Sequence, residues 1–195
     1  MRHAIQPVQQ FGYTRGKNST DSALIIDAMD LLYAGNLEGF AIVSSDSDFT
    51  RLATRLRESG MTVYGLGRRK TPEPFVAACD RFIHLELLSP ETRDPARAPS
   101  RDEVQAPPPP NLKALLSRAI SSTSKDDGWS HLGEVGSYLI KSHAAFDPRT
   151  YGHAKLGELV RTLPYLEVKE AAGPTGTSHL LVRLKPTAPK TGRTR

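Results

Sequence analysis

Two carboxylates in the first half of the chain, Asp46 and Asp48, have a sequence context that suits metal-assisted chemistry. They follow an apolar run over residues 39–45, and Asp48 begins a helical pattern, so they lie where a strand is expected to end. Ligands of open α/β sheets bind at the carboxyl ends of strands. Carboxylates converging there provide the oxygen ligands that Mg²⁺ and Mn²⁺ prefer, and such ions activate water for phosphodiester cleavage. Taken alone, the spacing fits turn and capping roles slightly better.

A third carboxylate, Asp21, lies on the apolar face of a helix predicted over residues 19–34. In a helical projection it shares that face with Ile25 and Leu32, whereas Asp27 points mainly to solvent. A carboxylate on a buried face needs compensation, which either the helix N-terminus or a metal ion can supply. The local sequence leaves capping and metal binding equally open for Asp21.

The segments around these carboxylates alternate between strand-like and helix-like patterns over residues 1–88. The helices begin at capping residues or end at glycines, and the strands are short apolar runs of the buried type. Such alternation predicts an α/β domain with a parallel sheet. The predicted strands span residues 4–13, 39–45, 61–65 and 81–87, and the predicted helices span residues 19–34, 48–58 and 73–79.

Proline separates this domain from a second one. Seven of the 15 prolines lie in residues 89–110, which predicts an extended linker, and residues 186–195 have the composition of a disordered basic tail. Residues 111–185 between them predict a winged helix, a small α+β domain that binds nucleic acids or other proteins. Its predicted helices span residues 112–121, 131–142 and 153–163, and its two predicted strands span residues 165–169 and 179–184.

The net charge of +5 averages two unlike halves. Residues 1–91 carry 10 basic and 11 acidic side chains, whereas residues 92–195 carry 16 and 10, and the basic half suits a polyanion such as nucleic acid.

The single cysteine, Cys79, excludes an internal disulfide and a cysteine-based zinc site. No apolar run reaches membrane-spanning length and no signal core is present, so we expect a cytoplasmic protein without a membrane partner.

Four segments of the first domain carry a family resemblance: residues 17–28 (KNSTDSALIIDA), 42–49 (IVSSDSDF), 56–65 (LRESGMTVYG) and 79–83 (CDRFI). Together they resemble the NYN domain, the LabA-like branch of the PIN-like nuclease superfamily, in which acidic residues hold a divalent metal for RNA cleavage. The resemblance implies an Mg²⁺ or Mn²⁺ site that serves catalysis. The residues it assigns to this site are Asp21, Asp46 and Asp48, with Asp27 a weaker candidate; Ser44 and Ser45 would shape the turn, and Lys17 would meet a phosphate.

The family's domain normally opens with a central strand that supplies the first metal-binding aspartate. Residues 1–16 contain no acidic residue and no segment that matches this strand. The resemblance therefore implies an N-terminally truncated NYN domain, either because the start codon was assigned too late or because this is a degenerate form.

Two segments of the second domain, residues 127–136 (DGWSHLGEVG) and 146–156 (FDPRTYGHAKL), resemble the OST-HTH or LOTUS domain. That family is a winged helix that binds RNA and, in some members, a helicase partner. Its fusion behind an NYN domain is a familiar arrangement, so each resemblance supports the other. The resemblance implies RNA as a partner, with a protein partner as the alternative.

Basic and aromatic residues of the second domain are candidates for the RNA contacts. The basic ones lie off the apolar face of the third predicted helix or near its start, where they can meet phosphates. Trp129 and Phe146 fit core anchors better than base-stacking residues, whereas Tyr151 fits either role. The phosphate candidates are Arg149, Lys155 and Arg161.

The sequence thus predicts a metal-dependent ribonuclease-type module joined to an RNA-binding winged helix. A catalytically inactive RNA-binding or adaptor protein is the alternative, favoured by the absent first strand. The linker would let the basic domain raise the local concentration of RNA at the nuclease.

Overall fold

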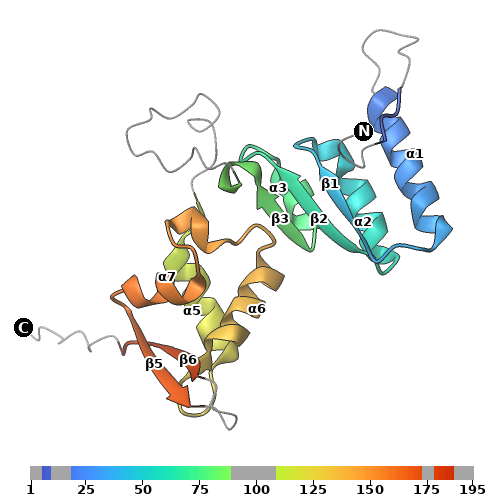
Figure 1. Ribbon diagram of the computed structural model, residues 1–195. Helices are drawn as coiled ribbons and strands as arrows, with labels where there is room; N and C mark the ends of the chain where they lie inside the picture. The colour runs from blue at the N-terminus through green and yellow to red at the C-terminus, as the bar shows by residue number, and fades with distance from the viewer. Residues whose placement is uncertain (1–5, 10–18, 89–108, 173–177, 187–195) are drawn as a thin grey trace, which may run out of the picture. The chain divides into compact units, whose positions relative to one another are not determined.

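The chain divides into two compact units, residues 1–82 and residues 83–195. The structure is a computed structural model that describes residues 6–9, 19–88, 109–172 and 178–186 (Figure 1). Lys17, nearly all of the predicted linker and all but the first residue of the predicted tail lie outside the described residues.

The first unit alternates helices and strands, and its sheet has the order β1-β2-β3. Strands β1 and β2 run parallel, with Gly39 opposite Thr62 and Val43 opposite Leu66. The predicted α/β domain with a parallel sheet is therefore confirmed. The elements are α1 (Ser19–Ala34), β1 (Gly39–Val43), the 3₁₀ turn η1 (Ser47–Phe49), α2 (Thr50–Glu58), β2 (Thr62–Gly67), α3 (Glu73–Ala78) and β3 (Arg81–His84).

The structure differs from the predicted elements of this unit at several points. Residues 6–9 form no strand, and the rest of the strand predicted over 4–13 lies outside the described residues. The helix predicted over 48–58 opens as the 3₁₀ turn η1, because the Asp46 side chain caps the chain before α2 begins. The last strand ends at His84, and the following Leu-Glu-Leu alternation forms the 3₁₀ turn η2 (Leu85–Leu87) instead.

The core of the first unit lies between the sheet and helices α2 and α3. Leu56 of α2, Val63 of β2 and Phe75 of α3 are fully buried, and the Phe82 ring meets the Phe75 ring edge-on at 5.9 Å. Gly65 makes this packing feasible, because a Cβ at that position would overlap the Phe82 ring. The position of β2, and of the loops at its ends, thus depends on a tightly packed aromatic core.

Helix α1 contains no fully buried residue. Asp21, Ile25 and Leu32 are half-buried, whereas Asp27 is exposed, so the face expected from the helical projection is the face that α1 turns inward. Several apolar side chains of this helix remain accessible, among them Ile26 at 59%. The helix therefore gains less from burial than α2 or α3 does.

The second unit is a winged helix, as predicted. Three helices cover one face of a small sheet of order β4-β6-β5, in which both neighbouring pairs are antiparallel (Figure 1). The two-residue strand β4 was not predicted, because two residues are too few to show a periodicity. The elements are α5 (Leu112–Thr123), β4 (Ser130–His131), α6 (Leu132–Ser142), the 3₁₀ turn η4 (Pro148–Tyr151), α7 (Leu156–Thr162), β5 (Leu166–Ala172) and β6 (Ser178–Leu184).

The third helix of this unit starts later than predicted. Asp147 and Pro148 do serve as N-cap and first residue, but of the 3₁₀ turn η4 rather than of a helix. Gly152 then ends η4 with a φ of 83°, a left-handed conformation that glycine adopts readily. Helix α7 begins only at Leu156.

The core of the second unit confirms one predicted anchor and contradicts the other. Phe146 is 8% exposed and belongs to the core, but Trp129 lies outside the core cluster of the described residues and is only half-buried. The prediction that Trp129 is a core anchor is therefore wrong. The buried cluster consists of Leu116, Ala119, Ile120, Val135, Leu139, Phe146, Leu159, Val160, Leu166 and Val182.

Candidate functional site

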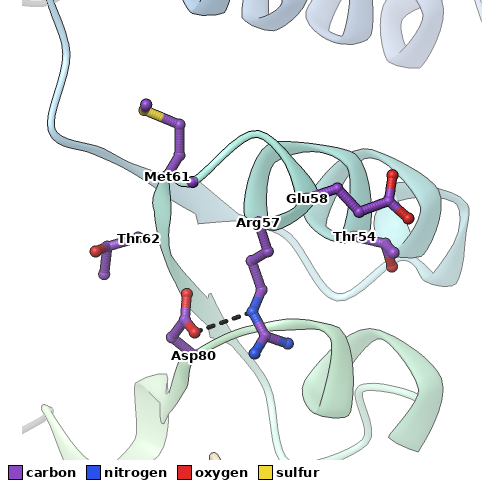
Figure 2. A pocket seen from close by; sticks show the side chains of 7 residues that line it. Thr54, Arg57, Glu58, Met61, Thr62 and Asp80 are labelled. Atoms are coloured by element: carbon purple, nitrogen blue, oxygen red, sulfur yellow. Dashed lines mark hydrogen bonds and ion pairs between the residues drawn. The ribbon is translucent and has the colours of Figure 1, made fainter.

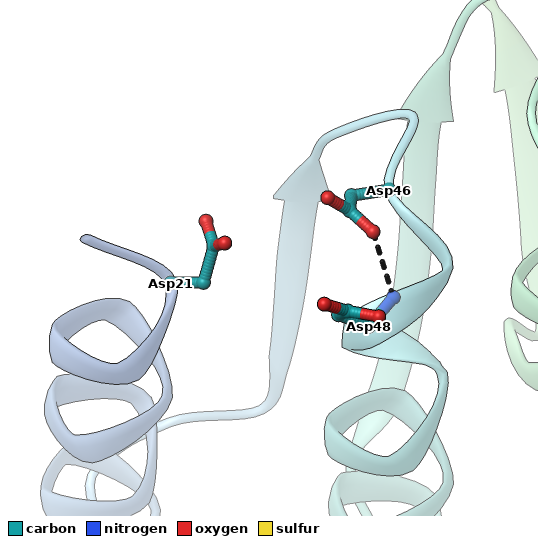
Figure 3. A group of neighbouring side chains, drawn as sticks. All are labelled: Asp21, Asp46 and Asp48. Carbon is teal, nitrogen blue, oxygen red and sulfur yellow. Dashed lines mark hydrogen bonds between the residues drawn. The ribbon is translucent and has the colours of Figure 1, made fainter. Parts of the chain in front are cut away.

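Three carboxylates of the first unit come together at the end of strand β1. Asp21 projects from the first turn of α1, and Asp46 and Asp48 come from the connection between β1 and α2 (Figure 3). One carboxylate oxygen of each residue lies within 4.8 Å of one oxygen of each of the others. Asp21 is half-buried, and the other two side chains are exposed. The fold thus gathers negative charge from two separate segments at the carboxyl end of the sheet.

A set of short hydrogen bonds holds the β1–α2 connection. The Asp48 N–H donates to Asp46 Oδ1 at 2.9 Å, and the Asp46 N–H donates to Ser44 Oγ at 3.1 Å. The Ser45 hydroxyl accepts from the Arg68 N–H at 2.9 Å and so ties the connection to the end of β2. Asp46 therefore uses one oxygen to cap η1, which fixes its backbone and leaves its second oxygen for another partner.

The end of strand β2 packs closely against this connection. The Ser44 N–H donates to the Leu66 carbonyl at 2.9 Å. A Cβ at the neighbouring Gly67 would overlap the Ser44 carbonyl oxygen, so the close approach of the two strand ends requires glycine there. The position of Asp46 is thus set by backbone packing as well as by side-chain hydrogen bonds.

The donor set fits a hard divalent cation. All three donors are carboxylates, which suit Mg²⁺ and Mn²⁺, and sulfur and imidazole donors are absent from the group. Three like charges this close also repel one another unless a cation lies between them. Asp27, the weaker candidate, is exposed and does not join the group.

A surface hollow lies elsewhere on this unit, beside the start of β2 (Figure 2). Two of its polar side chains form hydrogen bonds that hold the fold together. Arg57 Nε donates to Asp80 Oδ1 at 2.9 Å, and the Val63 N–H donates to Asp80 Oδ2 at 2.8 Å. Asp80 thereby ties α2 to β2 and to the start of β3. This hollow adds nothing to the carboxylate group, which lies at the opposite ends of the strands. Its lining residues are Thr54, Arg57, Glu58, Gly60, Met61, Thr62 and Asp80.

Two of the predicted RNA-contact residues of the second unit hold the loop around η4. Arg149 Nη2 donates to Asp147 Oδ2 at 2.8 Å and its Nε to Oδ1 at 3.0 Å, and this bidentate partner raises the Arg149 pKa. The Tyr151 hydroxyl donates to the Pro110 carbonyl at 2.9 Å, and burial raises its pKa. Both side chains have structural partners where the sequence predicts contacts with RNA.

The other two predicted contacts lie on the exposed side of α7. Lys155 is exposed at the N-cap position, and Arg161 is exposed in the last turn, where it pairs with Glu170 of β5. A solvent-facing pair of this kind is weak and exchanges readily with other anions. Lys155 and Arg161 are therefore placed where a phosphate can reach them.

Sequence reasoning missed a cluster around Trp129. Lys169 Nζ lies 4.0 Å and Arg183 Cζ 4.6 Å from the centre of the indole ring. The signal was the alternation around Ser130: this residue is fully buried, so Trp129 and His131 on either side must face away from the core. That alternation is visible only once residues 130–131 are known to be a strand.

Comparison with family models identifies the two domains. Residues 1–86 match the NYN domain, and residues 107–176 match the OST-HTH/LOTUS domain. The chain is an NYN domain followed by an OST-HTH/LOTUS domain. Both predicted resemblances are therefore confirmed, and a nuclease-like NYN domain joined to an RNA-binding OST-HTH/LOTUS domain supports an RNA-related function.

Two solved structures are similar to parts of this NYN–OST-HTH chain. A protein segment from Chromobacterium violaceum is 34% identical, covers 42% of this chain and 87% of its own length, and has a TM-score of 0.36. An uncharacterized protein from Nitrosomonas europaea is 30% identical, covers 51% of this chain and 90% of its own length, and has a TM-score of 0.38. No protein with a curated description matches.

Within the described ranges, none of the helices combines the length and the apolar character needed to cross a lipid bilayer.

Proposed function

We propose that the NYN domain is a metal-dependent ribonuclease and that the OST-HTH/LOTUS domain holds its RNA. The observation that carries this proposal is the meeting of Asp21, Asp46 and Asp48 at the carboxyl end of the sheet in a domain of a nuclease-like family. The carboxylates come from two segments separated in sequence, so their proximity is a property of the fold rather than of one acidic stretch.

In this proposal the three aspartates hold Mg²⁺ or Mn²⁺. Such an ion, when bound, supplies activated water and stabilises the charge that develops on the phosphate during phosphodiester hydrolysis. The chain's own contribution is position: the Asp48 N–H orients the Asp46 carboxylate, and the Ser45–Arg68 hydrogen bond holds the connection that carries both residues. Asp21 adds its charge from α1, across from that connection (Figure 3).

In this proposal the winged helix binds the RNA. Lys155 and Arg161 on the exposed side of α7 are the proposed phosphate contacts, while Arg149 and Tyr151 hold the adjoining loop. Tethering raises the effective concentration of bound RNA at the nuclease domain without any new contact.

A catalytically inactive RNA-binding or adaptor protein is the second candidate. The observation that favours it is the openness of the carboxylate group, because Asp46 and Asp48 are exposed and α1 has no fully buried residue. Metal-dependent catalysis generally takes place in a more enclosed site, where water is excluded and charges interact strongly.

Cleavage of RNA by the purified chain tests the proposal. We expect cleavage of labelled single-stranded RNA that requires Mg²⁺ or Mn²⁺, stops in EDTA and falls at least about 100-fold in Asp46→Asn. Asparagine is as good an N-cap as aspartate, so this variant keeps the η1 cap and removes only the charge. Asp30→Asn, an exposed change of the same kind on α1, is the matched control and should cleave normally.

Two results would overturn the proposal. Equal cleavage by Asp46→Asn and the unmodified chain would show that the carboxylate group is not the site. Binding of RNA without any metal-dependent cleavage would favour the adaptor function.

A further inference from the structure

The sheet of the winged helix has one face that its helices do not cover. Alternation assigns Ser130, Val182 and Val168 to the core, and Ser130 and Val182 are fully buried there. The residues that alternate with them along each strand therefore lie on the opposite, outer face. These outer-face residues are Trp129, His131, Glu167, Lys169, Ala171, His179, Leu181 and Arg183.

The strand register places these side chains in rows across the outer face. Glu167 pairs with Arg183, and one row further along His131 of β4 and Lys169 of β5 both lie opposite Leu181 of β6. Trp129 precedes His131 by two residues, which puts its ring on the same face beside Arg183. The aromatic ring and the cations thus form one continuous surface rather than isolated exposed residues.

The indole of Trp129 lies against two cationic side chains. Lys169 Nζ and Arg183 Cζ lie 4.0 Å and 4.6 Å from its centre, within the range of a cation–π interaction. The backbone beneath it is fixed as well, because the Trp129 N–H donates to Asp127 Oδ1 at 3.0 Å and its carbonyl accepts from the Lys125 N–H. The ring is therefore held in place although part of it remains exposed.

The charge of the surface suits a polyanion. Arg183 is paired with Glu167, whereas Lys169 is exposed and has no carboxylate partner in the described part of the chain. The rings of His131 and His179 meet edge-on at 6.1 Å beside these residues. An uncovered sheet face with an aromatic ring, a neighbouring ammonium group and two imidazoles can stack one base and contact the phosphates on either side of it.

We propose that this outer sheet face binds single-stranded RNA, with an unpaired base stacked at Trp129 and a phosphate at Lys169. The inference rests on the proposed function in taking RNA as the ligand, and adds where the RNA binds and that its bases are unpaired. A duplex does not fit, because its bases are stacked on one another and expose no ring to the indole.

The intrinsic fluorescence of the chain tests this directly, because Trp129 is its single tryptophan. The full chain is titrated with a single-stranded uridine oligomer in EDTA, which prevents cleavage, while anisotropy of a labelled copy reports binding. We expect the tryptophan emission to be quenched along the same binding curve. A duplex of equal length should bind more weakly and leave the emission unchanged.

Variants separate stacking from folding. Trp129→Ala should weaken binding about 5- to 100-fold, as expected for loss of one stacked base, and Trp129→Phe should restore most of the affinity. Lys169→Gln should lower the salt dependence of binding by about 0.7 in the log–log slope, whereas Lys141→Gln, an exposed lysine on α6, should leave it unchanged. Thermal unfolding of each variant checks that the winged helix is intact.

Binding with unchanged tryptophan emission would overturn the inference while leaving RNA as the partner of the chain. Quenching by duplex as strong as by single strand would overturn the assignment to unpaired bases. Loss of cleavage in Asp46→Asn together with unchanged quenching supports both proposals separately. Quenching in a chain that never cleaves RNA would support this inference and contradict only the proposed nuclease.

Discussion

Individual residues of the two units divide into those that hold the fold and those left to meet a ligand. Asp46 does both, because one of its oxygens caps η1 while the carboxylate also faces Asp21 and Asp48. Asp80 has only structural partners, since Arg57 and the Val63 N–H take its two oxygens. The sequence alone cannot separate these cases, because both aspartates lie beside strand ends.

Cys79 is buried in the core of the first unit. Its thiol is 3% exposed and donates to the Phe75 carbonyl at 3.3 Å. Burial raises its pKa from 9.0 to about 11, since desolvation disfavours the thiolate, while Arg57 opposes and Asp80 assists the shift. A thiol of this kind should be inert in the folded protein.

We predict that this thiol makes stability depend on pH between about 9 and 11. The unfolded chain loses the proton near pH 9 and the folded chain near pH 11, so the stabilisation is complete below pH 9 and is lost as the pH rises. The loss should reach about 2–3 kcal/mol. Urea unfolding of the unmodified chain and of Cys79→Ala at several pH values measures the difference, and parallel pH profiles would contradict the prediction.

At the scale of elements, the sequence predicted those with a clear pattern and missed those without one. The run over residues 39–45 followed by serines and aspartates identified β1 and the connection after it. Strand β4 was missed because only two residues form it, and with it the orientation of Trp129. The start of α7 was misplaced because Asp147 and Pro148 begin a 3₁₀ turn as readily as a helix.

The meeting of Asp21 with the β1–α2 connection was beyond the reach of sequence patterns. A helical projection places Asp21 on the inward face of α1 but does not say what that face meets. The tertiary packing of α1 against η1 decides that, and it also leaves Asp27 outside the group. The family resemblance supplied the grouping that residue spacing left open.

We predict that Gly67, at the end of β2, is required for the position of the β1–α2 connection that carries Asp46 and Asp48. Gly67→Ala places a methyl group on the Ser44 carbonyl oxygen and on the Phe82 ring, so we predict destabilisation of about 1–3 kcal/mol. It should also reduce RNA cleavage, because the displaced connection carries Asp46. Gly133→Ala in α6, where a Cβ meets nothing within 4 Å, is the control and should stabilise the chain by up to about 1 kcal/mol.

Thermal unfolding and the cleavage assay measure both effects. Equal stability of Gly67→Ala and the unmodified chain would mean that the strand ends can separate without cost.

At the scale of the whole molecule, the proposal joins chemistry in one unit to RNA binding in the other. Their contributions should separate kinetically, since tethering acts through the local concentration of RNA and not through the chemical step. This separation does not depend on any fixed arrangement of the two units.

Lys155→Ala should lower cleavage only when RNA is limiting. We expect RNA affinity to fall about 3- to 10-fold and the salt dependence of binding to weaken, because one phosphate contact is lost. The rate at saturating RNA should stay unchanged, and Lys141→Ala should behave like the unmodified chain. Measurement of kcat and KM tests this, and a fall in kcat with KM unchanged would place Lys155 in the chemical step.

The exposed helix α1 has a consequence for local opening. It has no fully buried residue, and its first turn brings Asp21 within 4.8 Å of two other carboxylates. We therefore expect its backbone amides to exchange with solvent through an opening that requires less free energy than unfolding of α2 or α3. A divalent cation that binds only when the three carboxylates are together raises the free energy needed for that opening. Hydrogen-exchange protection of α1 would then measure how fully the cation site is occupied.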